Sequence, residues 1–133
     1  MNKEEQVVNK QLSKELSKLN IVLYKNEDSY FHYVNGELIN PTDASEFETS
    51  SWPARDKWIK TFNVPELLSI LPCIIKIDRK TLMLSMGKAL DNKSFFVYYL
   101  DRKTKESKMT INNKRLANAL AKMLIVLKLH KII

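Results

Sequence analysis

The chain has 133 residues, of which 44% are hydrophobic and 28% are charged. This balance predicts one folded domain and excludes wholesale disorder. Cys73 is the only cysteine, so an internal disulfide is excluded, and its apolar neighbours predict a buried side chain in the reducing cytoplasm. The N-terminus has no apolar stretch, and apolar runs such as residues 123–127 are far below the roughly 18 residues of a spanning helix. Secretion and membrane insertion are therefore not expected.

Charge is distributed unevenly along the chain, whose net charge is +7. Residues 1–50 carry 5 Lys/Arg against 9 Asp/Glu, a net of −4, whereas residues 51–133 carry 17 against 6, a net of +11. Because clustered cations attract anions, this asymmetry indicates a polyanionic partner. The alternative is that the two halves neutralise each other within one fold.

The first 40 residues predict a helix and a short hairpin. Apolar residues at positions 8, 12, 16 and 19 recur at helical spacing, which predicts an amphipathic helix from about Lys3 to Leu19. Residues 21–24 and 30–34 are expected to be extended, and Asn35-Gly36 suits a tight type I′ turn before a strand at 37–39. Residues 41–51 are rich in Pro, Thr, Asp, Ser and Glu and predict a solvated connector.

Two short helices are expected next. Pro53 suits the first turn of a helix in which Trp58, Ile59 and Phe62 form an apolar face and which ends near Asn63. Residues 65–71 predict a second helix. It should stop at Pro72, because the proline ring clashes with the preceding turn.

From Cys73 onward the apolar period changes from helical to alternating. Short polar connections between the expected strands indicate an antiparallel meander. The four strands are Cys73–Asp78, Thr81–Lys88, Ser94–Leu100 and Lys105–Ile111. The predicted fold is a single α+β domain, residues 1–133. It comprises a helix-hairpin region at 1–40, the connector at 41–51 and an α-β-β-β-β-α core at 52–133.

A final helix is expected to begin at Asn112 or Asn113, whose side chains can cap it, and to run to about Leu129. Apolar residues at 116, 120, 123 and 127 lie on its buried side, packed on one face of the sheet. Apolar residues at 125, 126 and 129 widen this stripe. The helix is therefore central either to the core or to a homodimer contact.

Chain reversal at each turn places cations at the two ends of the predicted sheet. One end gathers Arg79, Lys80, Arg102, Lys103 and Lys105. The other end gathers Lys88, Lys93, Lys114 and Arg115. Lys114 and Arg115 fall in the expected first turn of the final helix, where the macrodipole disfavours a cation by roughly a few tenths of a kcal/mol. This placement is a further indication of an anionic partner.

Alternation also assigns residues to the two sheet faces. Those expected under the final helix are Cys73, Ile75, Ile77, Leu82, Leu84 and Met86. Lys76, Lys108 and Thr110 point the other way. Residues 95–100 are apolar on both faces, so three of them share the face of these cations, and Phe95, Tyr98 or Tyr99 is available for stacking on bases. The alternative is that the N-terminal helix or the 52–62 segment covers this face.

Catalytic and metal chemistry have little support in the sequence. His32 and His130 lack suggestive neighbours and are expected to be a strand surface residue and a helix-end residue. Two glycines are too few for a phosphate-binding loop, and one cysteine with two distant histidines leaves no zinc site. The expectation is a non-enzyme without cofactor or metal.

A first resemblance is carried by four consecutive features. They are residues 65–72 (PELLSILP), the following Ile74-Ile75-Lys76-Ile77, the aromatic strand, and a helix containing Ala-Leu-Ala-Lys-Met-Leu. This pattern resembles short uncharacterised α+β proteins of phages and mobile elements of gut Bacteroidetes, over roughly residues 52–130. The resemblance implies an intracellular accessory role. It carries over no functional residue.

A second resemblance is architectural. A helix, antiparallel strands and a helix with the basic start Lys114-Arg115 are similar to a double-stranded RNA-binding domain. That family grips phosphates from the start of its last helix and uses a Gly-Pro-containing turn between its first two strands. Here that turn is Asp78-Arg79-Lys80, and a fourth strand is added, so two features depart from the family.

Two functions remain open from the sequence. The first is a basic accessory protein that binds nucleic acid through the Lys/Arg-rich sheet ends. The second is a protein-interaction module, an inhibitor or adaptor encoded by a phage or mobile element, with acidic and basic halves serving complementary surfaces.

Overall fold

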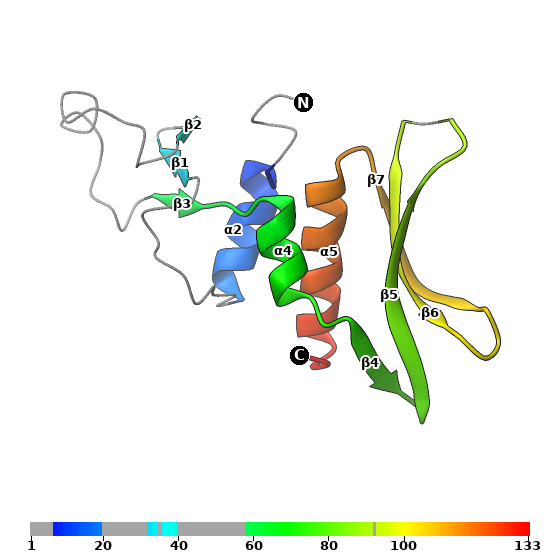
Figure 1. Ribbon diagram of the computed structural model, residues 1–133. Coiled ribbons are helices and arrows are strands. Elements are labelled where there is room, and N and C mark those ends of the chain that lie inside the picture. Colours follow the sequence, from blue (N-terminus) through cyan, green and yellow to red (C-terminus); the bar gives the residue numbers. More distant parts are fainter. Residues whose placement is uncertain (1–6, 20–31, 35, 40–57, 92) are drawn as a thin grey trace.

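The computed structural model is an α+β fold in which three helices lie between a small sheet and a larger one (Figure 1). It describes residues 7–19, 32–34, 36–39, 58–91 and 93–133. The helices of this part are α2 (Lys10–Lys18), α4 (Val64–Ile70) and α5 (Leu116–Leu129). Its strands are β1 (His32–Val34), β2 (Glu37–Ile39), β3 (Ile59–Lys60), β4 (Ile74–Ile77), β5 (Lys80–Lys88), β6 (Phe95–Asp101) and β7 (Ser107–Asn113).

The small sheet has the order β2-β1-β3 and contains the predicted hairpin. β1 pairs antiparallel with β2, and Gly36 between them has a φ of +85°, a conformation that glycine adopts without a Cβ penalty. The expected extended segment 21–24 and the connector 41–51 lie outside the described residues.

The N-terminal helix starts later than predicted. Asn9 caps it, with its Oδ1 accepting the Leu12 N–H at 2.8 Å, so the helix begins at Lys10. Val7 forms a bridge with Asn63, and the Val8 N–H donates to the Phe62 carbonyl at 3.0 Å. Two consecutive β-branched residues before an asparagine cap favour this extended entry over the helix expected from Lys3.

The prediction of a helix that ends near Asn63 is wrong over residues 58–63. Ile59 and Lys60 form β3, which pairs with Tyr33 and His32. Asn63 begins a helix instead, because its side chain accepts the Glu66 N–H while the Glu66 carboxylate accepts the Asn63 N–H, both at 2.9 Å. This capping box starts α4. The helix ends before Pro72 as predicted.

The antiparallel meander is confirmed, with the sheet order β4-β5-β6-β7. A bulge shifts the register between β6 and β7, so that Val97 pairs with Ile111 but Tyr99 pairs with Lys108. Met109, within the bulge, has a φ of +54°. The bulge adds one residue to β7 and bends that strand.

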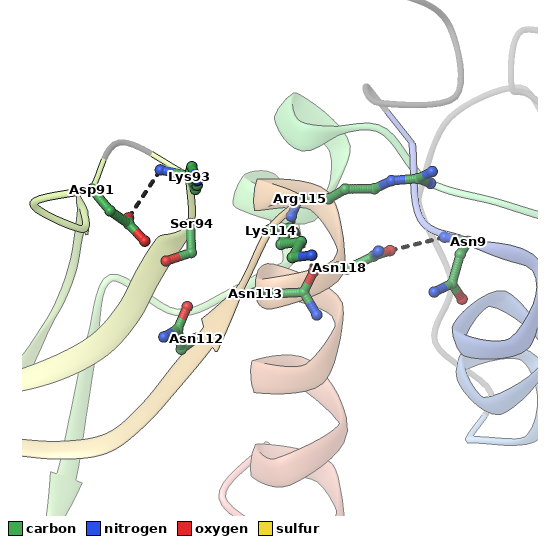
Figure 2. Close-up of a pocket in the computed structure, with 9 residues that line it drawn as sticks. All are labelled: Asn9, Asp91, Lys93, Ser94, Asn112, Asn113, Lys114, Arg115 and Asn118. Carbon is green, nitrogen blue, oxygen red and sulfur yellow. Dashed lines mark hydrogen bonds between the residues drawn. The ribbon is translucent and has the colours of Figure 1, made fainter.

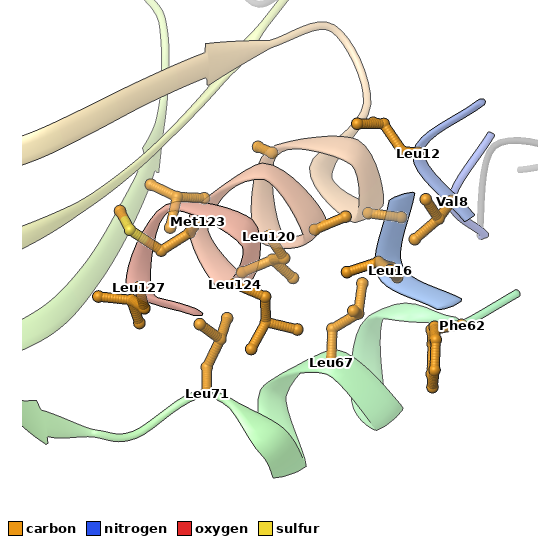
Figure 3. Close-up of a cluster of buried hydrophobic side chains, with 14 of the residues drawn as sticks. Val8, Leu12, Leu16, Phe62, Leu67, Leu71, Leu120, Met123, Leu124 and Leu127 are labelled. Atoms are coloured by element: carbon orange, nitrogen blue, oxygen red, sulfur yellow. The ribbon is translucent and has the colours of Figure 1, made fainter. Parts of the chain in front are cut away.

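Helix α5 is the centre of the core. It packs against β6 and β7 on one side and against α2 and α4 on the other, and Figure 1 shows it between these layers. Leu120 and Leu124 are fully buried together with Leu16 of α2 and Leu67 of α4, as Figure 3 shows. This arrangement confirms the core alternative for the helix. Leu129, expected to widen its apolar stripe, is 65% exposed.

Two residues expected under α5 are exposed instead. Cys73 precedes β4 and is exposed, with its carbonyl accepting the Leu84 N–H at 2.8 Å. Met86 is 39% exposed, because α5 lies over β6 and β7 and leaves the second half of β5 uncovered. Ile75 and Leu82 are buried as predicted, and Ile77 and Leu84 pack against the core. No helix in the described ranges is long and apolar enough to cross a membrane.

Candidate functional site

The two faces of the β4–β7 sheet differ in what covers them. Val97 and Tyr99 of β6 are fully buried against α5, whereas the alternate residues Phe96, Tyr98 and Leu100 are half-buried on the opposite face. No described element packs on that opposite face, and Figure 1 shows α2, α4 and α5 all on the other side. We call it the open face.

The strand register defines the composition of the open face. On β5, Met83 lies opposite Leu100, Ser85 opposite Tyr98 and Gly87 opposite Phe96. On β4, Ile74 is 55% exposed and lies opposite Met83. A Cβ built on Gly87 meets no atom within 4 Å. The face is therefore an accessible apolar and aromatic surface.

The expectation that the N-terminal helix or the 52–62 segment covers this face is wrong for the described residues. Helix α2 packs on α5 and β3. Residues 59 and 60 pair with β1 in the small sheet. The described parts of both segments thus lie on the far side of α5 and do not cover the sheet face.

The turns at one end of the sheet bring together the first group of cations. Arg79 lies in the β4–β5 turn and Lys80 begins β5, while the β6–β7 turn carries Arg102, Lys103 and Lys105. All five residues are exposed, and both turns lie at the lower end of the sheet in Figure 1. The structure thus places these cations at the same end of the sheet, and we call them the basic end.

Asp101 organises one of these turns. Its carboxylate accepts the Lys103 N–H at 3.0 Å, its carbonyl accepts the Lys105 N–H at 2.8 Å, and its own N–H donates to the Glu106 carbonyl at 2.9 Å. The Lys103 N–H is the main cause of a lowered pKa at Asp101, and the charge of Lys80 lowers it further. This electrostatic effect links the two turns.

The proposed stacking residues are not all placed as expected. Tyr99 is fully buried, its hydroxyl donates to the Pro72 carbonyl at 2.8 Å, and burial raises its pKa to about 12. It is therefore unavailable for stacking. Phe95 pairs with Lys88, whose Nζ lies 5.5 Å from the ring centroid. Tyr98 lies on the open face as the hypothesis requires.

Phe96 is the aromatic residue that sequence reasoning missed. It shares the open face with Tyr98, because residues two apart on a strand point to the same side. That periodicity alone could have selected Phe96 and rejected Tyr99. Lys108 departs from the prediction for a different reason. The bulge pairs it with Tyr99, which places it on the α5 side of the ladder.

The opposite end of the sheet contains a polar cleft of about 700 Å³ (Figure 2). Its walls are the β5–β6 turn, the end of β7 with its connection to α5, Asn118 in the first turn of α5, and Asn9, which caps α2. Lys93, Lys114 and Arg115 of the second cation group line it, while Lys88 lies over Phe95.

The start of α5 differs from the prediction. Asn112 and Asn113 end β7, where they pair with Phe96 and Phe95, so neither residue caps the helix. Arg115 occupies the N-cap position without a side-chain capping hydrogen bond, and its N–H donates to Asn113 Oδ1 at 3.0 Å. Lys114 and Arg115 therefore precede the helix. They do not lie in its first turn.

The two histidines lie on different elements, His32 in β1 and His130 at the end of α5. His32 is buried, not on the strand surface as expected, and its ring meets that of Trp58 edge-on at 5.6 Å between centroids. His130 is exposed at the end of α5. Within the described ranges, no group of three or more His, Cys, Asp and Glu side chains could hold a metal ion.

Comparison of the chain with protein-family models, curated proteins and solved structures finds no match. The likenesses to phage proteins and to double-stranded RNA-binding domains therefore stay predictions.

Proposed function

We propose that this chain is a non-enzymatic protein that binds single-stranded nucleic acid across the open face of the β4–β7 sheet. The observation that carries the proposal is the pair Phe96 and Tyr98, half-buried on a face that no described element covers. An aromatic ring on an accessible sheet offers a stacking platform to any base. Single strands suit this face better than duplexes, because their bases are free to stack on protein side chains.

The charge around this face supports the same ligand. Residues 73–133 hold 14 Lys/Arg against 4 Asp/Glu. The basic end borders the part of the open face that contains Lys76 and Leu100. Its cations are within reach of the backbone of a strand whose bases stack on Tyr98 and Phe96. Glu106 forms its ion pair with Lys108, at 3.4 Å, and so leaves the positive potential of the basic end in place.

A protein partner is the second candidate, and one observation favours it. Ile74, Met83 and Leu100 form an aliphatic row across three strands of the open face. Such a row suits the apolar centre of a protein interface better than a polyanion. The partner would then be a host or phage protein, with this chain acting as an inhibitor or adaptor.

Fluorescence anisotropy with a labelled 12-nucleotide single strand, in DNA and RNA forms, tests the proposal. The double variant Phe96→Ala/Tyr98→Ala should weaken binding about tenfold or more, since each stacked base contributes about 1–3 kcal/mol. Met86→Ala is the matched control, because Met86 is an exposed residue on the other side of the same sheet. Equal loss in both variants, or no binding at low salt, would contradict the proposal.

The contribution of the basic end is measured separately. Arg102→Gln/Lys103→Gln should reduce the slope of log affinity against log salt by about 1.4, because two phosphate contacts are lost at about 0.7 each for a single strand. Lys122→Gln/Lys128→Gln, which removes two exposed charges from α5, is the control and should leave the slope nearly unchanged. A pull-down that captures one stoichiometric protein equally with and without nuclease treatment would favour the protein partner instead.

A further inference from the structure

We infer that the polar cleft at the opposite end of the sheet binds a phosphomonoester of nucleotide size. Its volume of about 700 Å³ falls within the usual range of small-molecule sites. This volume also exceeds what a lone inorganic phosphate would fill. Three segments that are distant in sequence, at Asn9, residues 91, 93 and 94, and residues 112–118, meet there, so the cleft is formed by the tertiary fold (Figure 2).

The charge of the cleft selects an anion. Lys93, Lys114 and Arg115 line it, and Asp91 is the one carboxylate among the described lining residues. One oxygen of that carboxylate already accepts the Lys93 backbone N–H at 3.0 Å. The two lysines therefore outweigh this carboxylate among the described lining residues, which favours a phosphate ester as ligand.

The amide side chains add donors in a fixed orientation. Asn9 Oδ1 accepts the Leu12 N–H at 2.8 Å, Asn113 Oδ1 accepts the Arg115 N–H at 3.0 Å, and Asn118 Oδ1 accepts the Asn9 N–H at 2.9 Å. With each oxygen engaged by the backbone, the group that each amide offers to a ligand is its NH₂ donor. A cleft rich in donors is complementary to the acceptor oxygens of a phosphate ester.

One of these amides is part of the buried framework. Asn118 is only 5% exposed and joins the first turn of α5 to the residue that caps α2. This contact holds two walls of the cleft in position before a ligand arrives. A preformed site avoids the entropic cost of ordering its walls on binding.

The phosphate has two possible sources. Asn112, which lines the cleft, pairs with Phe96 of the open face, so the cleft adjoins that face. The first source is a free nucleotide, whose binding does not depend on the proposed function. The second is the terminal phosphate of a strand bound on the open face, and an inference of this kind depends on the proposed function. The experiment separates these two sources.

Isothermal titration calorimetry of the full chain with uridine 5′-monophosphate, uridine and inorganic phosphate tests the site. We expect the nucleotide to bind at least tenfold more tightly than uridine or inorganic phosphate. The variant Lys93→Gln/Lys114→Gln should lower this affinity at least tenfold. The matched double variant Lys122→Gln/Lys128→Gln on α5 should not change it. All four lysines are exposed, and thermal melting confirms that both variants fold.

A single strand with either a 5′-phosphate or a 5′-hydroxyl provides the second arm. If the 5′-phosphate raises the affinity of the parent protein for the strand and has no such effect in Lys93→Gln/Lys114→Gln, that result would assign the site to strand ends. Binding of the free monophosphate would assign the site to nucleotides. Absence of both effects overturns the inference. It would leave the open-face proposal intact, because that proposal is measured with Phe96→Ala/Tyr98→Ala.

Discussion

The two faces of strand β6 show how one strand serves two purposes. Val97 and Tyr99 are fully buried beneath α5, while Phe96 and Tyr98, their immediate neighbours, lie on the open face. All four are apolar or aromatic, so hydrophobicity alone does not distinguish them. The difference arises from packing: α2 and α4 cover the far side of α5, and no described element covers the other face of the sheet. An aromatic residue on that uncovered face therefore contributes less to stability and is available to a partner.

The largest effect should come from comparing the two adjacent tyrosines. Tyr99→Ala should lower the free energy of unfolding by about 3–5 kcal/mol, because it opens a cavity in the core. Tyr98→Ala should cost about 1 kcal/mol or less, mainly through lost cross-strand contacts. Urea denaturation measures both values. Similar losses in the two variants would mean that the open face is covered.

A second comparison uses pH to separate the same two residues. The pKa of Tyr99 is raised from 10 to about 12 by burial, so the folded state favours the neutral phenol. The stability that this contributes is fully present below pH 10 and is lost as the pH rises toward 12. Tyr99→Phe should cost about 1 kcal/mol at neutral pH through the lost bond to Pro72. It should also flatten the decline of stability between pH 10 and 12.

Denaturation midpoints collected from pH 8 to 12 provide this measurement. Tyr98→Phe is the control and should follow the parent protein throughout. Parallel curves for the parent and Tyr99→Phe would contradict the assignment of the stability loss between pH 10 and 12 to the ionisation of Tyr99.

The two glycines extend the comparison to the backbone. Gly36 has a positive φ in the β1–β2 turn, so Gly36→Ala should cost about 1 kcal/mol. Gly87 lies on the open face with no atom near a new Cβ, so Gly87→Ala should be neutral or should stabilise by about 0.5 kcal/mol. Thermal melting of both variants gives the sign of the change in stability. Destabilisation by Gly87→Ala equal to that of Gly36→Ala would indicate that something packs above Phe96.

The smallest effect should be found at Asp101. Its pKa is lowered, first by the Lys103 N–H, so its contribution to stability is present above the ordinary carboxyl pKa and is lost as the pH falls through the lowered value. Asp101→Asn should therefore be slightly less stable than the parent at pH 7, with the difference vanishing in acid. Melting temperatures from pH 7 down to pH 2 follow this change. A constant difference across that range would contradict the expected role of the charge.

Local patterns predicted the C-terminal half of the fold well. Alternation and short polar turns identified β4 to β7, and helical spacing identified α5, because these signals lie within each segment. β3 was missed, since two residues become a strand only through pairing with the distant β1. The later start of α2 depends on Val7 and Val8 reaching residues 62 and 63, a contact between distant parts of the chain.

The candidate site was predictable in part for similar physical reasons. Reversal at each turn was enough to gather Arg79, Lys80, Arg102, Lys103 and Lys105 at one end. Selecting Phe96 over Tyr99 required consistent use of the two-residue period. The openness of the face and the polar cleft depend on which side of α5 the other helices occupy, and no local pattern determines that choice.

The bulge in β7 has a consequence for how the protein behaves at high concentration. A regular outer strand presents a straight row of unpaired amides and carbonyls, onto which a second molecule can add its own strand. In β7 the left-handed Met109 interrupts that row, and the exposed Lys108, Thr110 and Asn112 surround the interruption. Continuation of the sheet from one molecule to the next is thereby discouraged. The bulge thus lowers the risk of sheet extension through β7 in a sheet with one face that no described element covers.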